Sequence, residues 1–273
     1  MKFFTLASED GAAIPCYEWG ISKPKGFFQI IHGMGEHSKR YDWAARQLNK
    51  AGYCVIANDQ RGHGGAIRKI PGDMGVDGWM QSLKDAYRVN SFIRDLYLNP
   101  KIFMFGHSMG SLVAYSLGAR HKDKVSKIAL LGTSVPMPVS DVLLNAAEDN
   151  DHASIDMTNI WSHSSTGKIG RSENPGANNL LVGQRLLERA GDGVLYSDLR
   201  ACNEFDVGQM PEMELPCLVI VGEADKMTPA SAGVSVAENL AQAEVCSLSG
   251  CGHAMLSERP NEVLDALSGF ILN

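Results

Sequence analysis

The chain has 273 residues, 44% of them hydrophobic and 21% charged, and its formal net charge is −6 at pH 7. This length suits one large domain with a sizeable core, and an acidic chain without a basic tract is not typical of nucleic-acid binding. No apolar run approaches the 18 residues of a membrane-spanning helix, and the first residues lack the pattern of a signal peptide. We therefore expect a cytoplasmic protein with no integral membrane segment and no nucleic-acid partner.

The six cysteines predict neither a disulfide framework nor a metal site. The chain contains no C-x-x-C and no H-E-x-x-H pattern, which are common signatures of metal binding. Cys54 and Cys217 lie in apolar runs, where a free thiol packs as a small apolar group. We expect buried free thiols, no metal and no cofactor.

The first hundred residues predict strands that alternate with helices. Short apolar runs bounded by turn residues are typical of strands, and longer stretches with apolar residues at helical spacing are typical of helices. The expected strands are residues 3–6, 14–19, 27–31 and 53–57, of which the first two form an antiparallel pair. The expected helices are residues 41–48 and 78–98.

The loop after the strand at 27–31 has two interpretations. It reads HGMGEH, and in a hydrolase an HG-type loop here supplies one backbone N–H of the oxyanion hole, which would be that of Met34. Alternatively, Gly33 and Gly35 begin a dinucleotide-binding fingerprint, with Asp59 as the ribose-binding acid. The third glycine of that fingerprint is missing, because Ser38 stands in its place.

The loop DQRGHG at residues 59–64 follows the strand at 53–57. Asp59 and Arg61 are charged residues at the end of a buried strand, and both catalytic and structural roles fit them. We expect the two side chains to pair with each other and to fix the loop.

The most informative stretch is residues 102–120. An apolar run at 102–105 leads into GHSMG at 106–110, and residues 111–120 have helical spacing. The order of strand, sharp turn and helix is the context in which G-x-S-x-G forms a nucleophile elbow. Such a turn exposes Ser108 to a base and to oxyanion donors, the second of which would be the N–H of Met109.

A further strand is predicted at 125–131, and the sequence becomes more polar after it. Between residues 135 and 213 the apolar runs break up and polar clusters intervene, although helical patches remain. We predict a cap inserted between two parts of one core, so that residues 1–134 and 214–273 form the core and residues 135–213 form the cap. His152 and His163 of this cap are expected at the surface.

The acid and the base are expected after the last two strands. The strand at 218–221 ends near Asp225, and the strand at 245–248 precedes His253. Glu223 alternates to the other face and is the weaker acid candidate, and Thr228 is expected to cap the next helix. A C-terminal helix is expected at 260–271.

The order Ser108, Asp225, His253 is that of nucleophile, acid and base in an α/β-hydrolase. Each residue follows a strand, so all three can meet at the carboxyl edge of one sheet. His253 would take the proton of Ser108, and Asp225 would orient and stabilise the imidazole. Strands alternating with helices predict a mostly parallel central sheet flanked by helices.

These motifs resemble those of the α/β-hydrolase superfamily, and more narrowly the serine-aminopeptidase-like group that includes monoacylglycerol lipases and lysophospholipases. The resemblance rests on residues 32–41, 59–64 and 106–110. It implies a lid over an acyl pocket, which would be the insertion at 135–213, and hydrolysis of a carboxylic ester such as a monoacylglycerol, a lysophospholipid or a small acyl ester.

Two alternatives stay open at this point. The same three residues could hydrolyse another acyl bond, in an amide, a thioester or a carbon–carbon bonded substrate. The chain could also be a non-catalytic ligand receptor on the same fold, although a receptor does not need all three residues.

Overall fold

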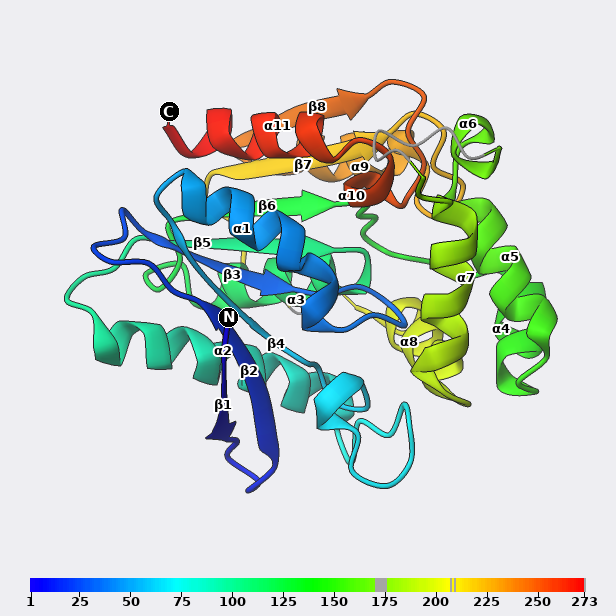
Figure 1. Ribbon diagram of the computed structural model, residues 1–273, viewed down its shortest axis with the longest axis horizontal. Coiled ribbons are helices and arrows are strands. Elements are labelled where there is room, and N and C mark those ends of the chain that lie inside the picture. The colour runs from blue at the N-terminus through cyan, green and yellow to red at the C-terminus, as the bar shows by residue number, and fades with distance from the viewer. Residues whose placement is uncertain (170–175, 207, 209, 273) are drawn as a thin grey trace.

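Within residues 1–169, 176–206, 208 and 210–272, which the computed structural model describes, eight strands form one sheet (Figure 1). Their order is β1-β2-β4-β3-β5-β6-β7-β8. β2 pairs antiparallel with β1 and with β4, and all other neighbours are parallel, as the alternation of elements predicts. The strands are β1 (Lys2–Ala7), β2 (Ala13–Trp19), β3 (Phe27–Ile31), β4 (Cys54–Asn58), β5 (Ile102–His107), β6 (Lys127–Leu131), β7 (Cys217–Gly222) and β8 (Ala243–Leu248).

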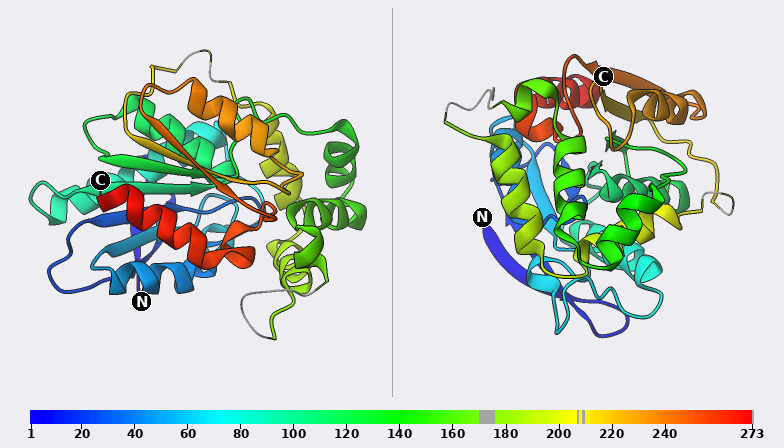
Figure 2. Two further views of the ribbon diagram at one scale, coloured as in Figure 1. Left: turned by 90° about the horizontal axis from the view of Figure 1, so that it is seen from above. Right: turned by 90° about the vertical axis from the view of Figure 1, so that its right-hand side faces the viewer.

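Helices cover both faces of the sheet, which confirms the predicted α/β-hydrolase architecture. Seen from above, α1 and α11 lie on one side of the strands, and α2, α3 and α9 lie on the other (Figure 2, left). The bounds are α1 (Asp42–Lys50), α2 (Gly78–Leu96), α3 (Met109–Arg120), α9 (Ala230–Glu238), α10 (Met255–Glu258) and α11 (Pro260–Leu272), with 3-10 turns η1 (Ser38–Tyr41) and η2 (Gly64–Ala66).

The pleat of the strands explains why both faces are covered. Successive side chains of a strand point to opposite faces, so a strand between two helical layers is apolar at every position. In β5, Phe103 and Phe105 pack in the cluster that contains Leu267 of α11, whereas Met104 packs in the cluster that contains Leu112 of α3. The unbroken apolar run at 102–105 is therefore the sequence signal of a central strand.

The helices α4 to α8 lie between β6 and β7 in the chain and gather beyond the carboxyl ends of the strands (Figure 1). We call them the cap helices. Their bounds are α4 (Asp141–Glu148), α5 (His152–Ser162), α6 (Ser165–Lys168), α7 (Asn179–Ala190) and α8 (Val194–Asn203). The division into a core at 1–134 and 214–273 and a cap at 135–213 stays a prediction.

Among the described residues, no helix is both long enough and apolar enough to span a lipid bilayer. The cytoplasmic location stays a prediction. Cys54 and Cys217 are buried free thiols, as expected.

Candidate active site

Ser108 lies on the sharp turn between β5 and α3. Its φ of 53° and ψ of −124° form a strained conformation for a residue with a side chain. The flanking glycines make the turn possible, because a Cβ on Gly106 would lie 2.3 Å from the carbonyl oxygen of Gly110, and a Cβ on Gly110 would lie 2.3 Å from that of Ile31. Met109 is the first residue of α3, so its N–H is one of the amides that a helix leaves without an intrahelical acceptor.

Asp225 and His253 are in direct contact. The Nδ1 atom of His253 donates to Oδ2 of Asp225 over 2.8 Å, and only 5% of Asp225 and 4% of His253 are exposed. Burial alone would raise the pKa of Asp225, but the imidazole of His253 and the donors of Thr228 lower it overall. Burial alone would lower the pKa of His253, but the Asp225 carboxylate raises it overall.

Asp225 is held by the start of the segment that follows it. Its Oδ1 atom accepts the backbone N–H groups of Met227 at 2.8 Å and Thr228 at 2.9 Å, and its Oδ2 atom accepts the hydroxyl of Thr228 at 2.8 Å. Thr228 is therefore not the expected helix cap, since Pro229 takes that position before α9. The sequence does contain a signal for these bonds, because an Asp can accept the backbone N–H and the hydroxyl of a Thr three residues later.

Ser108 Oγ and His253 Nε2 face the same small cavity, and neither has a hydrogen-bond partner among the described residues. Because Nδ1 of His253 donates to Asp225, Nε2 is left as the nitrogen that can accept a proton. In ligand-free enzymes the bond between nucleophile and base is often formed only with substrate. The three residues lie at one edge of the sheet, after β5, β7 and β8.

The loop after β3 carries a buried ion pair beside this cavity. Glu36 accepts the N–H of Gly33 at 3.0 Å and the hydroxyl of Tyr41 at 2.6 Å, and it pairs with Arg40 at 2.7 Å. Burial alone would raise the pKa of Glu36, but the Arg40 guanidinium holds it well below its usual range. The network fixes the loop that contains Met34, and the sequence alone predicts no separate role for Glu36 or Arg40.

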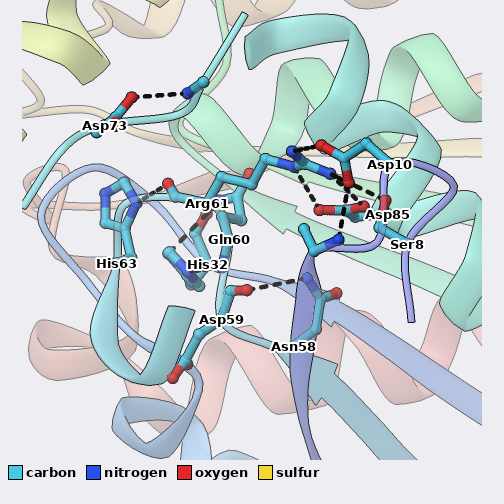
Figure 3. Close-up of polar contacts among 12 residues, drawn as sticks. Ser8, Asp10, His32, Asn58, Asp59, Gln60, Arg61, His63, Asp73 and Asp85 are labelled. Atoms are coloured by element: carbon cyan, nitrogen blue, oxygen red, sulfur yellow. Dashed lines mark hydrogen bonds and ion pairs between the residues drawn. The ribbon is translucent and has the colours of Figure 1, made fainter. Parts of the chain in front are cut away.

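The loop after β4 differs from its prediction in one respect. Arg61 does not pair with Asp59; its guanidinium extends towards Asp10 and Asp85, at 2.6 and 2.7 Å (Figure 3). Asp59 points the other way, where it accepts the N–H groups of Ser38 and Gly65, both at 2.8 Å. Both residues fix the loop, as expected, but through different partners.

Asp198 of α8 joins the cap helices to both loops. Its Oδ2 atom accepts from the backbone N–H of Gly35 and from Nε2 of His63, each at 2.8 Å, and Asp198 is fully buried. Burial alone would lower the pKa of His63, but the Asp198 carboxylate raises it overall. No sequence motif marks this contact.

The two cap histidines differ. His152 is exposed, as predicted, beside Asp156 and Glu188. The prediction for His163 is wrong, because it is only 3% exposed and lines the cavity beside Ser108. Gly183 of α7 makes this burial possible, since a Cβ there would lie 2.9 Å from Cε1 of His163.

Two cavities meet at Ser108 and Met34, which line both, and each is lined by polar as well as apolar side chains. The larger, which we call the apolar cavity, has a volume of about 410 Å³ and is lined by Met137, Val139, Leu143, Trp161, Leu199 and Met227, among others. The smaller, the polar cavity, has a volume of about 50 Å³ and is lined by Glu36, Arg40, His107, Thr158, Asn159 and His253, among others. Within the described ranges, no group of His, Cys, Asp and Glu side chains is arranged to hold a metal ion.

The model of the serine aminopeptidase, S33, family matches residues 22–260, a span that includes Ser108, Asp225 and His253. The chain belongs to this family. Mouse monoglyceride lipase is 29% identical over 228 residues, which cover 81% of this chain and 73% of that protein. Human monoglyceride lipase is 27% identical over 268 residues, which cover 93% of this chain and 84% of that protein.

Solved structures share the fold of this S33 family member. The esterase EaEST from Exiguobacterium antarcticum superposes with a TM-score of 0.81 at 19% identity, covering 98% of this chain and 99% of that one. This likeness shows the fold alone. Family membership does not favour the dinucleotide interpretation of Gly33 and Gly35, whose loop instead borders the two cavities at Ser108 through Met34.

Proposed function

We propose that Ser108, His253 and Asp225 form the catalytic triad of this carboxylic ester hydrolase, and that its preferred ester joins a medium-length acyl chain to a small polyol, as in a monoacylglycerol. The chain is a serine hydrolase of carboxylic esters, which its S33 membership and its similarity to monoglyceride lipases support. The alternatives of another acyl bond and of a non-catalytic receptor are not favoured.

The contacts of His253 support its role as the base. Nε2 takes the proton of Ser108 while Oγ attacks the acyl carbon, and the resulting imidazolium lies beside the buried carboxylate of Asp225. The protonated imidazole then gives its proton to the leaving alcohol oxygen, and the acyl group stays on Ser108. A water molecule activated by His253 releases the acid in the second half of the reaction.

The oxyanion of each tetrahedral intermediate needs fixed donors. The N–H of Met109, at the open end of α3, and the N–H of Met34, in the loop that Glu36 holds, are the donors that we propose. Each such donor typically contributes about 10²- to 10³-fold to turnover. The positive end of the helix dipole at α3 adds to the stabilisation.

The position of Ser108 between the two cavities supports the proposed substrate class. An ester bound at Ser108 can place its acyl chain in the apolar cavity and its alcohol in the polar one. About 410 Å³ is within the usual range of small-molecule sites, roughly 300 to 1,000 Å³. Because Arg40 is already paired with Glu36, the described residues that line the polar cavity offer no unpaired arginine or lysine to a phosphodiester, so we favour a glyceryl ester over a lysophospholipid.

A kinetic panel tests this proposal. Purified protein would be given 1-monoacylglycerols with acyl chains from four to sixteen carbons, and a lysophosphatidylcholine. We expect the highest kcat/KM for medium-chain glyceryl esters and a loss of at least about 10⁴-fold in Ser108→Ala. Hydrolysis by Ser108→Ala at the rate of the unchanged protein would overturn the assignment of the nucleophile, and a preference for the lysophospholipid would overturn the substrate class.

A further inference from the structure

We propose that Thr158 and Asn159 of cap helix α5 recognise a free hydroxyl of the substrate's alcohol, and so make the enzyme selective for polyol esters over esters of simple alcohols. The inference rests on the proposed function, since it assigns the alcohol of the ester to the polar cavity. The two residues lie across the cavity from the core residues that bind and activate the ester.

Thr158 lines the cavity and has a buried hydroxyl without a partner. The residue is 4% exposed, and its Oγ1 has no hydrogen-bond partner among the described residues. A threonine in a helix commonly donates to the backbone carbonyl one turn earlier, which here would be that of Ser154. Thr158 does not use this local acceptor, so its hydroxyl stays available to a ligand.

Asn159 lines the same cavity and has a buried acceptor without a partner. Its Nδ2 atom donates to the carbonyl of Leu180 at 2.8 Å, which identifies the other amide atom as the oxygen. That Oδ1 atom is buried and has no partner among the described residues. Since a carbonyl oxygen can only accept, the group that satisfies it must be a donor, such as an alcohol O–H.

The close approach of α7 limits the space for this group. Gly183 of α7 lines the polar cavity, and a Cβ on it would lie 2.5 Å from Asn159 Oδ1. At roughly 10 to 15 Å³ for each water-sized probe, about 50 Å³ admits a group of only a few heavy atoms. A short polyol fits these limits better than a long or charged alcohol.

Selectivity follows from the cost of leaving buried polar atoms unpaired. A glyceryl ester brings hydroxyls that can satisfy Thr158 Oγ1 and Asn159 Oδ1, whereas an ethyl ester buries both atoms without a partner. Sites built to bind a substrate hydroxyl reject analogues that lack it more strongly than apolar pockets reject a missing methylene.

The experiment compares kcat/KM for the glyceryl and the ethyl ester of the same medium-chain acid. Thr158→Val removes the hydroxyl at nearly constant shape, and we expect the ratio of the two values to fall about 5- to 10-fold. Thr158→Ser restores a hydroxyl and should keep the ratio within about twofold. Ser154→Ala is the matched control, because Ser154 is a buried hydroxyl on the same helix that donates to the Asp151 carbonyl and does not line the cavity.

Gly183→Ala provides an independent variant, because its methyl group would press on Asn159 Oδ1 from α7. We expect the same fall in the ratio of the two kcat/KM values. An unaltered ratio in both Thr158→Val and Gly183→Ala, or an equal fall in Ser154→Ala, would overturn the inference and leave the ester hydrolase standing. If the unchanged protein hydrolysed neither ester, the proposed function itself would fail.

Discussion

The two walls of the site differ in how their polar atoms are satisfied. On the core wall, Asp225 accepts three hydrogen bonds besides that of His253, and Glu36 accepts from Gly33, Tyr41 and Arg40. On the cap wall, Thr158 and Asn159 line the polar cavity, and each has a buried side-chain oxygen without a partner among the described residues. The two carboxylates of the core wall have their partners before substrate arrives, whereas Ser108 Oγ, His253 Nε2 and the two cap-wall oxygens lack a partner among the described residues and can take one from the substrate. We therefore expect changes on the core wall to alter rate and changes on the cap wall to alter selectivity.

The largest loss of activity is expected when Asp225, the acid of the core wall, is changed. Asp225→Asn should lower kcat by about 10⁴-fold, because an amide no longer holds the imidazole in the right tautomer or stabilises its cation. His253 acts only when neutral, and its raised pKa places the acid limb of the kcat/KM profile above the ordinary value of about 6.5. In Asp225→Asn the residual activity should show this limb at lower pH. A variant with an unshifted limb would contradict the pairing of Asp225 with His253.

Asp198 joins the cap helices to the loops after β3 and β4, and we expect this contact to stabilise the folded protein. Asp198→Asn removes the charge from a buried pair with His63, and we expect a loss of about 3 kcal/mol in the free energy of unfolding at pH 5.5. The pKa of His63 is raised in the folded protein, so this stabilisation is full below about 6.5, the ordinary pKa, and is lost as pH rises through the folded value.

Urea unfolding of both proteins at pH 5.5 and at pH 9 measures this dependence. The difference between the two proteins should be clearly smaller at pH 9. A difference of the same size at both values would show that Asp198 does not stabilise a charged His63.

A smaller effect, confined to selectivity, is expected in the apolar cavity. Val139→Phe places a larger side chain in the cavity, so kcat/KM for long-chain esters should fall about 10-fold while that for a butyrate ester changes little. Val142→Phe is the matched control, because Val142 is 68% exposed on α4. An equal loss on short and long esters, or the same profile in the control, would show that Val139 does not border the acyl chain.

The two walls also differ in how far the sequence predicts them. The strand, turn and helix around Ser108 is a local pattern, and strict steric limits at Gly106 and Gly110 make it recognisable. The mostly parallel sheet follows from the alternation of elements, and Asp225 and His253 are found by their place after strands. In the core, the sequence predicts the positions of side chains better than their partners. Arg61 pairs with Asp10 and not with Asp59, and Thr228 donates to Asp225 and does not cap α9.

The cap wall could be predicted only as a segment. Its helices contain no motif, and their contacts join distant parts of the chain: the bond from Gly35 to Asp198 spans 163 positions. His163 was expected at the surface, and its burial depends on a glycine of another helix. Packing of this kind depends on tertiary geometry that periodicity does not reveal.

The convergence of Ser108, Asp225 and His253 is tested most directly by covalent labelling with a fluorophosphonate, followed by mass spectrometry of the digested protein. We predict one adduct, on Ser108, formed at least about 100-fold more slowly in His253→Ala and in Asp225→Asn than in the unchanged protein. An adduct on another residue, or labelling of His253→Ala at the unchanged rate, would contradict the account.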